Sequence, residues 1–191
     1  DDGSLGGLSS SIAGATLPVA GTYFFKVNHF SATSQLRPYR LFYAIRSGTP
    51  APEIEPNDTA GQATLPASGW VSGATSAPAD LDNYSMILNA GDTVFLSLDM
   101  DPERDTVEWN GTLSFGSFGA PPSLLQVNDA GAATPDSEAS FFTVKDAGIY
   151  QVVVAAAAGS GTYHLAVQVF PGAPATATCT TYASIDVPKA I

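Results

Sequence analysis

Short segments in which apolar and polar residues alternate recur along much of this 191-residue chain. In Thr93–Asp99, three apolar side chains (Val94, Leu96 and Leu98) fall on one face of an extended chain, because successive side chains of a strand point to opposite sides. The same alternation marks Tyr150–Val154 and Tyr163–Val169. Weaker patterns predict further strands at residues 69–74, 82–89, 112–118, 123–127 and 138–145.

Turn residues separate these segments, and helix signals are weak. Ala90-Gly91-Asp92 and Asp146-Ala147-Gly148 indicate turns that lie directly before strands. Residues 58–63 are compatible with one short turn of helix. About eight short strands with Gly, Pro, Asn and Asp between them predict an all-β fold, a β-sandwich of jelly-roll type.

Part of this pattern occurs twice. Ala20-Gly21-x-Tyr23 falls on Ala147-Gly148-x-Tyr150 at an offset of 127 residues, and Tyr39-x-Leu41 falls on Tyr163-x-Leu165 at an offset of 124. Residues 1–48 are therefore interpreted as the C-terminal part of a first β repeat, with strands at 23–27 and 39–45. Such a partial repeat exposes unpaired strand edges, so its other strands are expected either outside the printed sequence or in another chain.

Proline-rich stretches divide the chain into parts. Pro50-Ala51-Pro52 predicts a stiff, extended linker at residues 49–52. Residues 53–170 then form the complete repeat. Residues 171–191 are interpreted as a second linker followed by the start of a further domain.

The charge of the chain excludes one class of partner. The net charge is −11, and residues 51–170 hold fifteen acidic residues against Arg104 and Lys145. An acidic surface repels phosphate, so no nucleic-acid partner is expected, whereas cation binding or simple solubility remain open. No apolar run reaches the length of a membrane span. Cys179 is the only cysteine, so no disulfide can form within the chain, and its role stays open.

Signatures of catalysis are absent from the sequence. His29 and His164 are the only histidines, and they occupy non-equivalent positions in the two repeats. The chain has neither the Gly-x-Ser-x-Gly elbow of hydrolases nor the His-Glu-x-x-His helix of metalloproteases. We therefore expect this chain not to be an enzyme.

Oxygen-bearing side chains crowd into one short stretch at the start of the complete repeat. Glu53, Glu55 and Asn57 lie on one side of an extended chain, and Asp58 can turn towards them where the strand ends. Pro56 stiffens the path between them. The alternative interpretation is an Asx-type turn at residues 57–58 with two solvated glutamates beside it.

A second pair of carboxylates, Asp80 and Asp82, shares one face and is placed to complete the group from a neighbouring loop. Calcium takes six to eight oxygen ligands and accepts mixed carboxylates, amides and carbonyls. The sequence therefore predicts a calcium site with six candidate ligands: Glu53, Glu55, Asn57, Asp58, Asp80 and Asp82.

Five motifs occur in a fixed order over residues 53–170. They are Glu53-x-Glu55-Pro56-Asn57-Asp58-Thr59, Asp80-x-Asp82-x-Tyr84-Ser85, Ala90-Gly91-Asp92, Ala147-Gly148-x-Tyr150 and Tyr163-x-Leu165-x-Val167. Together they resemble the bacterial pre-peptidase C-terminal domain, and the latter part of the pattern recurs in residues 1–48. The tail at residues 185–191 resembles the opening strand of a proprotein-convertase-type P domain.

The resemblance implies a jelly-roll β-sandwich in a secreted protein, outside the catalytic domain of a peptidase. It implies a ligand role for Glu53, Glu55, Asn57 and Asp58, with Asp80 and Asp82 placed less directly because loop lengths vary there. We expect calcium to pin the junction between modules and to raise the melting temperature, and Asp58→Ala to abolish the rise. The expected partners are other domains of the same polypeptide.

Two other functions follow from the same resemblance. Related modules of clostridial collagenases bind collagen, so the chain could bind collagen or another extracellular polymer through exposed aromatic residues. Others are removed during maturation of the parent peptidase. The aromatic residues considered for polymer contact are Trp70, Trp109, Phe115 and Phe118.

Overall fold

The computed structural model describes residues 17–28, 31, 33, 41, 43–76, 79–103, 109–127 and 138–172. Within these residues the chain forms strands and turns without any helix, so the predicted all-β class is confirmed. It follows that this part of the chain contains no helix long and apolar enough to cross a membrane. The strands are β1 Ala51–Pro52, β2 Trp70–Thr75, β3 Leu81–Leu88, β4 Thr93–Asp99, β5 Asn110–Ser117, β6 Leu125–Val127, β7 Glu138–Thr143, β8 Gly148–Ala158 and β9 Gly161–Phe170.

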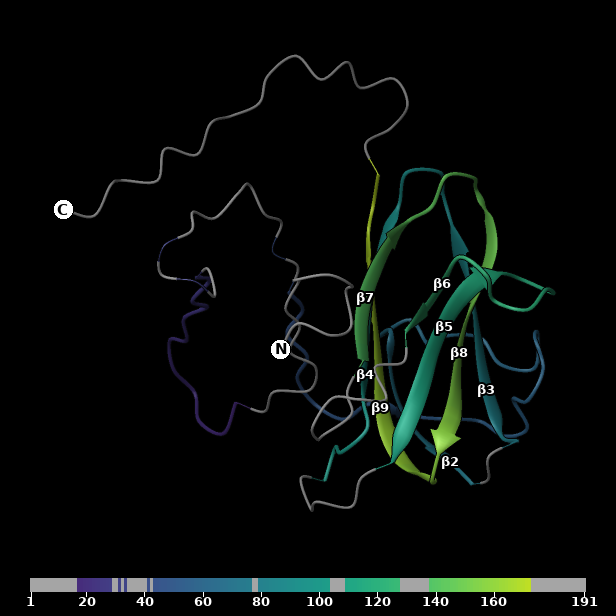
Figure 1. The fold of residues 1–191 in the computed structure, drawn as a ribbon, viewed down its shortest axis with the longest axis horizontal. Coiled ribbons are helices and arrows are strands. Elements are labelled where there is room, and N and C mark those ends of the chain that lie inside the picture. Colours follow the sequence, from purple (N-terminus) through teal and green to yellow (C-terminus); the bar gives the residue numbers. More distant parts are fainter. Residues whose placement is uncertain are drawn as a thin grey trace, which may run out of the picture.

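The strands form a sandwich of two sheets, shown in Figure 1. One sheet has the order β1-β2-β9-β4-β7 and the other the order β3-β8-β5-β6. All neighbours are antiparallel except β1 and β2, which run parallel. Counted from β2 as the first strand, the orders 1-8-3-6 and 2-7-4-5 are those of a jelly roll.

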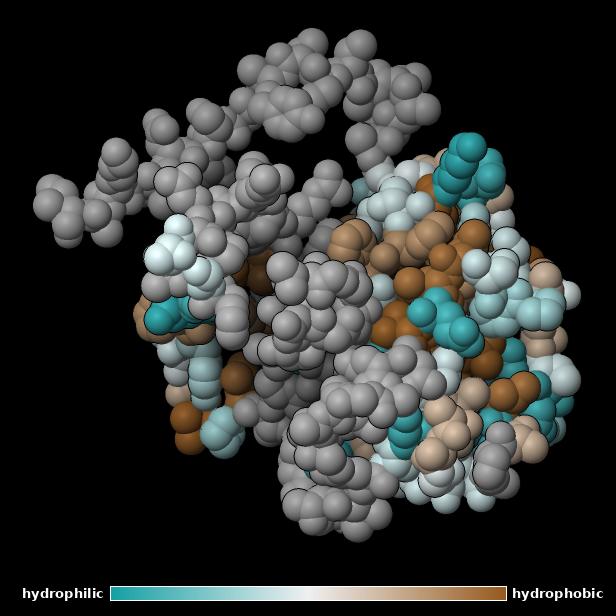
Figure 2. All heavy atoms as spheres, viewed as in Figure 1, coloured by the Kyte–Doolittle hydropathy of each residue, from teal (hydrophilic) through white to brown (hydrophobic). Residues whose placement is uncertain are grey.

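The core lies between the two sheets. The alternation of β4 places Val94, Leu96 and Leu98 on the inner face, where none of them is exposed. From the opposite sheet, Phe115 of β5 stacks on Tyr150 of β8, with ring centroids 5.4 Å apart. Burying an aliphatic or aromatic side chain of this size contributes about 1.5–3 kcal/mol. In Figure 2 hydrophobic residues remain visible between β7 and the β5–β6 pair, where edge strands of the two sheets meet.

All eight strands predicted for the complete repeat are present, with boundaries shifted by a few residues. β8 differs most from its predicted length, since it continues to Ala158. β1 is a strand that the sequence did not predict: Ala51 and Pro52 belong to the predicted linker, yet they pair with Val71 and Ser72 of β2. A two-residue strand that includes proline carries no alternating pattern, which is why the sequence does not predict it.

The strand expected at residues 23–27 is not formed. Residues 17–28 and 43–50 contain no strand, and most of their large apolar side chains are exposed. The physical reason is that a strand needs a neighbouring backbone to pair with, and the described residues provide none here. Residues 39, 40 and 42 of the second expected strand lie outside the described residues, as do His29, Cys179 and the whole tail at 173–191.

Candidate metal centre

Glu53 is positioned by the edge of β2. It directly follows β1, and its backbone N–H donates to the carbonyl of Ser72 at 2.9 Å. One carboxylate oxygen, Oε1, accepts a hydrogen bond from the backbone N–H of Ala74 at 2.7 Å. The second oxygen, Oε2, is then directed towards the space between the two sheets, where two tyrosine hydroxyls lie.

Gly73 makes room for this carboxylate. A Cβ atom at residue 73 would contact the ring and hydroxyl of Tyr163 and would lie 2.5 Å from Oε2 of Glu53. Any side chain at this position would therefore displace the two groups from each other. The glycine is required by the close approach of the glutamate and the tyrosine over the strand.

Asp82, the second residue of β3, closes the group from the other sheet and is completely buried. The hydroxyl of Tyr163 donates to its Oδ2 at 2.7 Å, and the hydroxyl of Tyr84 lies 2.7 Å from that of Tyr163. The same two hydroxyls lie 3.2 and 3.4 Å from Oε2 of Glu53. Because each hydroxyl carries one proton, the two hydroxyls cannot donate to all of these oxygens at once, and the contacts with Oε2 of Glu53 are the longer ones.

Glu55 and Asn57 complete the group. The backbone N–H of Asn57 donates to Oε2 of Glu55 at 3.0 Å. The backbone carbonyl of Asn57 accepts two hydrogen bonds from Asn83, one from its backbone at 2.9 Å and one from its side chain at 3.0 Å. These bonds hold residues 53–58, the junction segment, against β3. Asn57 is fully buried there.

The carboxylates of Glu53, Glu55 and Asp82 converge closely enough to share one ion. One oxygen from each lies within 4.8 Å of the others. Calcium–oxygen distances of about 2.3–2.6 Å allow two ligands to be at most ~5 Å apart, whereas magnesium, at about 2.0–2.1 Å, requires ~4 Å. The three carboxylates are therefore close enough together to bind one calcium ion.

The side-chain amide of Asn57 points into this group. It lies 3.0 Å from Oδ1 of Asp82 and 3.3 Å from Oε2 of Glu55. With its nitrogen towards the carboxylates the amide donates a hydrogen bond to both; with its oxygen towards them it adds a fourth ligand oxygen and needs a cation to offset the repulsion. The set of oxygen atoms thus fits a hard cation. The buried amide of Asn57 can bind the cation through its oxygen, or donate to the carboxylates through its nitrogen when no cation is bound.

Electrostatic strain accompanies the cluster. Burial raises the pKa of Asp82 to about 7, and the nearby carboxylates of Glu53, Asp80 and Glu55 contribute to this rise. Burial also raises the pKa of Glu53, although the N–H of Ala74 partly opposes the shift. A positive ion would offset both effects, because it favours the charged form of every carboxylate around it.

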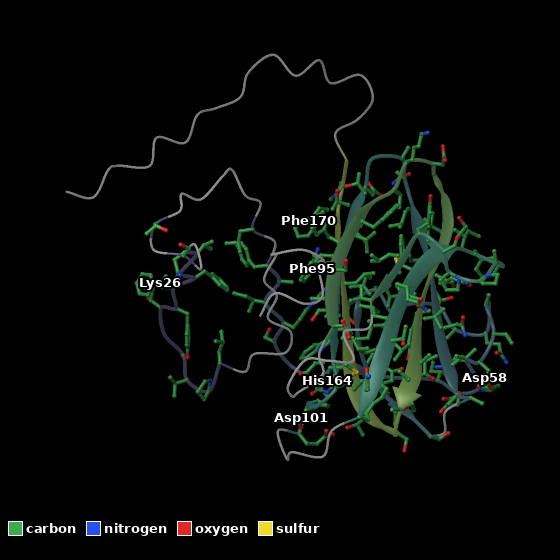
Figure 3. The ribbon with its side chains drawn as sticks, in the orientation of Figure 1. Lys26, Asp58, Phe95, Asp101, His164 and Phe170 are labelled. Carbon is green, nitrogen blue, oxygen red and sulfur yellow. The ribbon has the colours of Figure 1, made fainter. Side chains whose placement is uncertain are left out.

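The structure leaves two of the six predicted ligands outside this cluster. Asp80 precedes β3, and its Oδ2 accepts hydrogen bonds from the backbone N–H and the hydroxyl of Ser76, at 2.6 and 2.8 Å. Asp58 is exposed and lies at the outer margin of the molecule in Figure 3. Glu53, Glu55, Asn57 and Asp82 are brought together, which makes them the four candidate ligands.

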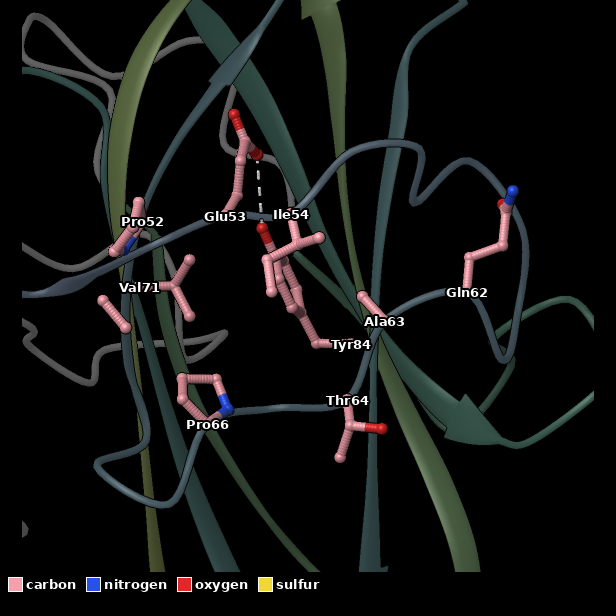
Figure 4. Close-up of a pocket in the computed structure, with 10 residues that line it drawn as sticks. Pro52, Glu53, Ile54, Gln62, Ala63, Thr64, Pro66, Val71 and Tyr84 are labelled. Atoms are coloured by element: carbon pink, nitrogen blue, oxygen red, sulfur yellow. Dashed lines mark hydrogen bonds between the residues drawn. The ribbon is translucent and has the colours of Figure 1, made fainter.

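A hollow of about 260 Å³ adjoins the cluster. Figure 4 shows it between the junction segment and the 62–66 segment, with the Glu53–Tyr84 hydrogen bond at its edge. Its walls are largely apolar, with Val71, Ala63 and Pro66 among the lining residues. Among the residues that line it, Glu53 is the one carboxylate, so the hollow offers no further ligands of that type.

Sequence reasoning misses three residues of this centre in their observed roles. Tyr84 and Tyr163 occur in two of the sequence motifs and both are buried, but their contacts with Asp82 and Glu53 are not foreseen. The alternation in Asp82-x-Tyr84 places these two side chains on one face of β3 and is the available signal. The remaining partner, Tyr163, and the role of Gly73 depend on the pairing of β9 with β2.

The fold and the centre define a class: an all-β sandwich module with a carboxylate cluster where the chain enters it. No protein-family model and no curated protein matches the chain. Among solved structures it is similar to PliG, a periplasmic lysozyme inhibitor of g-type lysozyme from Aeromonas hydrophila, at 14% identity over 62% of this chain and 94% of that chain, with a TM-score of 0.40. It is also similar to the pre-peptidase C-terminal domain of collagenase from Bacillus anthracis, at 18% identity over 52% of this chain and 87% of that chain, with a TM-score of 0.35.

Proposed function

We propose that this chain is a non-catalytic accessory part of a secreted bacterial protein, with a peptidase as the parent, and that calcium stabilises the junction at which the complete module begins. The observation that carries the proposal is the convergence of Glu53, Glu55 and Asp82 within 4.8 Å, with the buried amide of Asn57 directed at the same point. The order of sequence motifs over residues 53–170 supports the assignment to an extracellular, peptidase-associated module.

The proposed ion would act on geometry. Glu53 and Glu55 belong to the junction segment, whereas Asp82 belongs to β3 in the opposite sheet from β1. An ion held by all three would tie the segment to the body of the module and would replace the repulsion between these carboxylates with attraction. Because it binds the folded form, it would also raise stability by mass action.

The segment just before β1 is also attached to the module, through Arg46. Its guanidinium donates to the carbonyl of Ser68 at 2.6 Å and to that of Val167 at 2.7 Å. The chain is therefore held on both sides of β1, by Arg46 before it and by Glu53 after it. This double attachment supports a role in setting the direction in which the preceding segment leaves the module.

The aromatic residues considered for polymer contact give no comparable support for a binding platform. Trp109 and Phe115 are buried, and the indole N–H of Trp109 donates to the carbonyl of Thr162 at 2.9 Å. Trp70 is half-buried and packs edge-on against His164, with centroids 5.8 Å apart. Phe118 is 40% exposed, which makes it the one exposed ring of the four and leaves it without an exposed neighbour among them. The calcium-stabilised junction is therefore the function that the geometry favours.

The test is calcium binding by the 191-residue chain, measured by calorimetry after removal of divalent ions with a chelator. We expect one calcium site, with a dissociation constant on the order of 10⁻⁴ M or tighter, and weaker binding of magnesium. Glu53→Gln and Glu55→Gln should each weaken binding at least ~10-fold. Because Asp58 lies outside the cluster, its replacement is no longer expected to abolish the effect of calcium. Asp58→Asn is therefore the matched control and should bind as the unmodified chain does; absence of binding by the unmodified chain contradicts the proposal.

A further inference from the structure

The segment before the complete module repeats a local structure found inside it. The hydroxyl of Tyr23 donates to the carbonyl of Val19, four residues earlier, at 2.5 Å. The hydroxyl of Tyr150 donates to the carbonyl of Asp146, also four residues earlier, at 2.6 Å. Both pairs are related by the same offset of 127 residues that relates the two sequence repeats.

The glycines that precede these tyrosines repeat the geometry as well. A Cβ atom at Gly21 would lie 4.0 Å from the ring of Tyr23, and one at Gly148 would lie 3.9 Å from the ring of Tyr150. We call this Gly-x-Tyr motif, with its tyrosine hydroxyl bonded to the carbonyl four residues back, the tyrosine corner. In the complete module it stands at the start of β8, which begins at Gly148. The segment from Gly21 onwards therefore starts as a counterpart of β8 although it pairs with no described strand.

The apolar side chains of this segment are exposed where their counterparts form the core. Tyr23, Phe25 and Val27 have exposed fractions of 41–61%. Their counterparts at the offset of 127, Tyr150, Val152 and Val154, have exposed fractions of at most 6%. Each of the three side chains thus matches a residue that a sandwich buries.

A second strand shows the same contrast. Leu41 and Tyr43 are 50% and 58% exposed, whereas their counterparts at the offset of 124, Leu165 and Val167 of β9, are at most 3% exposed. The rings of Phe25 and Tyr43 contact each other, with centroids 5.7 Å apart. The two segments therefore contact each other through Phe25 and Tyr43, whose counterparts Val152 and Val167 lie in opposite sheets.

These correspondences specify what would cover the exposed side chains. In the complete module β8 lies between β3 and β5, and β9 lies between β2 and β4. We propose that residues 17–48 insert as the last two strands of a second sandwich, into a six-stranded partner built from counterparts of β2–β7. The partner offers two open slots, one in each of its sheets, and it buries Tyr23, Phe25, Val27, Leu41 and Tyr43.

A second copy of this segment is a poorer occupant. Two copies would supply two strands of the β8 type and two of the β9 type, and neither type pairs with itself in the complete module. The segment lies to one side of the complete sandwich in Figure 3, where Lys26 is labelled, and brown spheres mark its apolar residues there in Figure 2. Large apolar side chains that are exposed together, as Tyr23, Phe25, Val27, Leu41 and Tyr43 are, favour a specific partner rather than solvent.

The first test measures hydrogen exchange in the unmodified 191-residue chain. Backbone amides at residues 22–27 should exchange at close to the rate of an unstructured peptide, because no strand pairs with them. Slow exchange that is independent of protein concentration would mean that the segment is already covered. Slow exchange that appears only at high concentration would mean that a second copy covers it. Either result overturns the proposal.

The second test places the segment in a sandwich that lacks its own last two strands. In a full-length variant, residues 147–170 are replaced by residues 20–46; the three extra residues fall in the turn between the two strands. We expect cooperative unfolding, and exchange at residues 22–27 of the inserted copy at least ~100-fold slower than in the unmodified chain.

The control for this exchange carries residues 21–47 in the same place. A one-residue slip moves every side chain of a strand to the opposite face, so this chain has nearly the same composition but the wrong register. We expect it to unfold without cooperativity and to show no protection at residues 22–27. If the in-register variant behaves like the slipped control, the segment is not a counterpart of β8 and β9 and the proposal is wrong.

Discussion

Replacing the buried Asp82 by asparagine should stabilise the folded chain without calcium and remove most of the stabilisation that calcium provides. In the absence of a cation, burial and the neighbouring carboxylates raise the pKa of Asp82 to about 7. An unfolded chain releases this proton near pH 4. Between those two values the folded protein holds a proton that the unfolded chain has lost, so the free energy of unfolding falls as the pH rises through this window.

The size of the effect follows from the same shift. One pKa unit corresponds to about 1.4 kcal/mol, and solvent screening and relaxation reduce the part that is recovered on mutation. The amide oxygen of an asparagine can still accept the hydrogen bond from Tyr163. At pH 8 in chelator, Asp82→Asn should therefore raise the free energy of unfolding by ~1–3 kcal/mol, and at pH 4 the gain should vanish.

Calcium offsets this gain. With a dissociation constant of ~10⁻⁴ M, 10 mM calcium stabilises the unmodified chain by ~2.7 kcal/mol, because it binds the folded form alone. For a module of this size that is a rise of roughly 10 °C in melting temperature. Asp82→Asn removes a charged ligand from the cluster and should lose most of this rise.

The assay is urea and thermal unfolding, followed by circular dichroism, in chelator and in calcium. Asp58→Asn, which changes an exposed carboxylate, serves as the control and should behave as the unmodified chain. A fall in stability of Asp82→Asn in chelator, equal to that in calcium, would show that the carboxylate acts only as a structural hydrogen-bond acceptor. That result would refute the reasoning.

Three further predictions concern the same junction. Calcium affinity should increase up to ~10-fold per pH unit between pH 5 and 7, because the ion displaces the proton of Asp82; calorimetry at three pH values tests this, and a constant affinity would contradict it. Gly73→Ala should lower the free energy of unfolding by ~1–3 kcal/mol, because the added Cβ contacts Tyr163, and it should abolish the calcium-dependent rise in melting temperature; an unchanged rise would show that Gly73 is not needed for the site. Arg46→Met should destabilise the junction by ~1–3 kcal/mol by leaving the carbonyls of Ser68 and Val167 without their charged donor, and limited proteolysis should then cut faster at residues 43–52; equal cleavage rates would argue against this role.

The strands of the sandwich were predictable because alternation is a local property. Val94, Leu96 and Leu98 share a face in any extended chain, and burying that face requires a second layer. The pattern therefore predicts β4 with its observed limits, and the other long strands to within a few residues. It does not predict β1, whose pairing depends on the position of β2 rather than on its own two residues.

The candidate ligands show the limit of predictions from the alternation of side chains along a strand. Asp80 and Asp82 alternate in sequence, but Asp80 lies before the first residue of β3 and turns to bond with Ser76. Asp58 likewise follows the extended stretch that presents Glu53, Glu55 and Asn57, and its side chain points outward. A two-residue period places side chains on a common side only while the backbone remains extended.

The same limit explains the segment at residues 23–27. Its alternation is as regular as that of β8, and its tyrosine corner forms, yet no strand results. Local sequence specifies which side chains should be buried together. It cannot supply the neighbouring backbone, because main-chain hydrogen bonds in a sheet are made between segments distant in the chain.

The sequence by itself determined the all-β class, the faces of the strands and the crowding of carboxylates at the junction, because each depends on residues close together in the chain. Only the tertiary structure decided that Asp82 from one sheet meets Glu53 at the edge of the other, that the hydroxyls of Tyr84 and Tyr163 lie between them, and that Asp80 and Asp58 stand apart. Burial and charge density at that meeting point raise the pKa of Asp82. Both arise from the packing of two sheets, which no local pattern encodes.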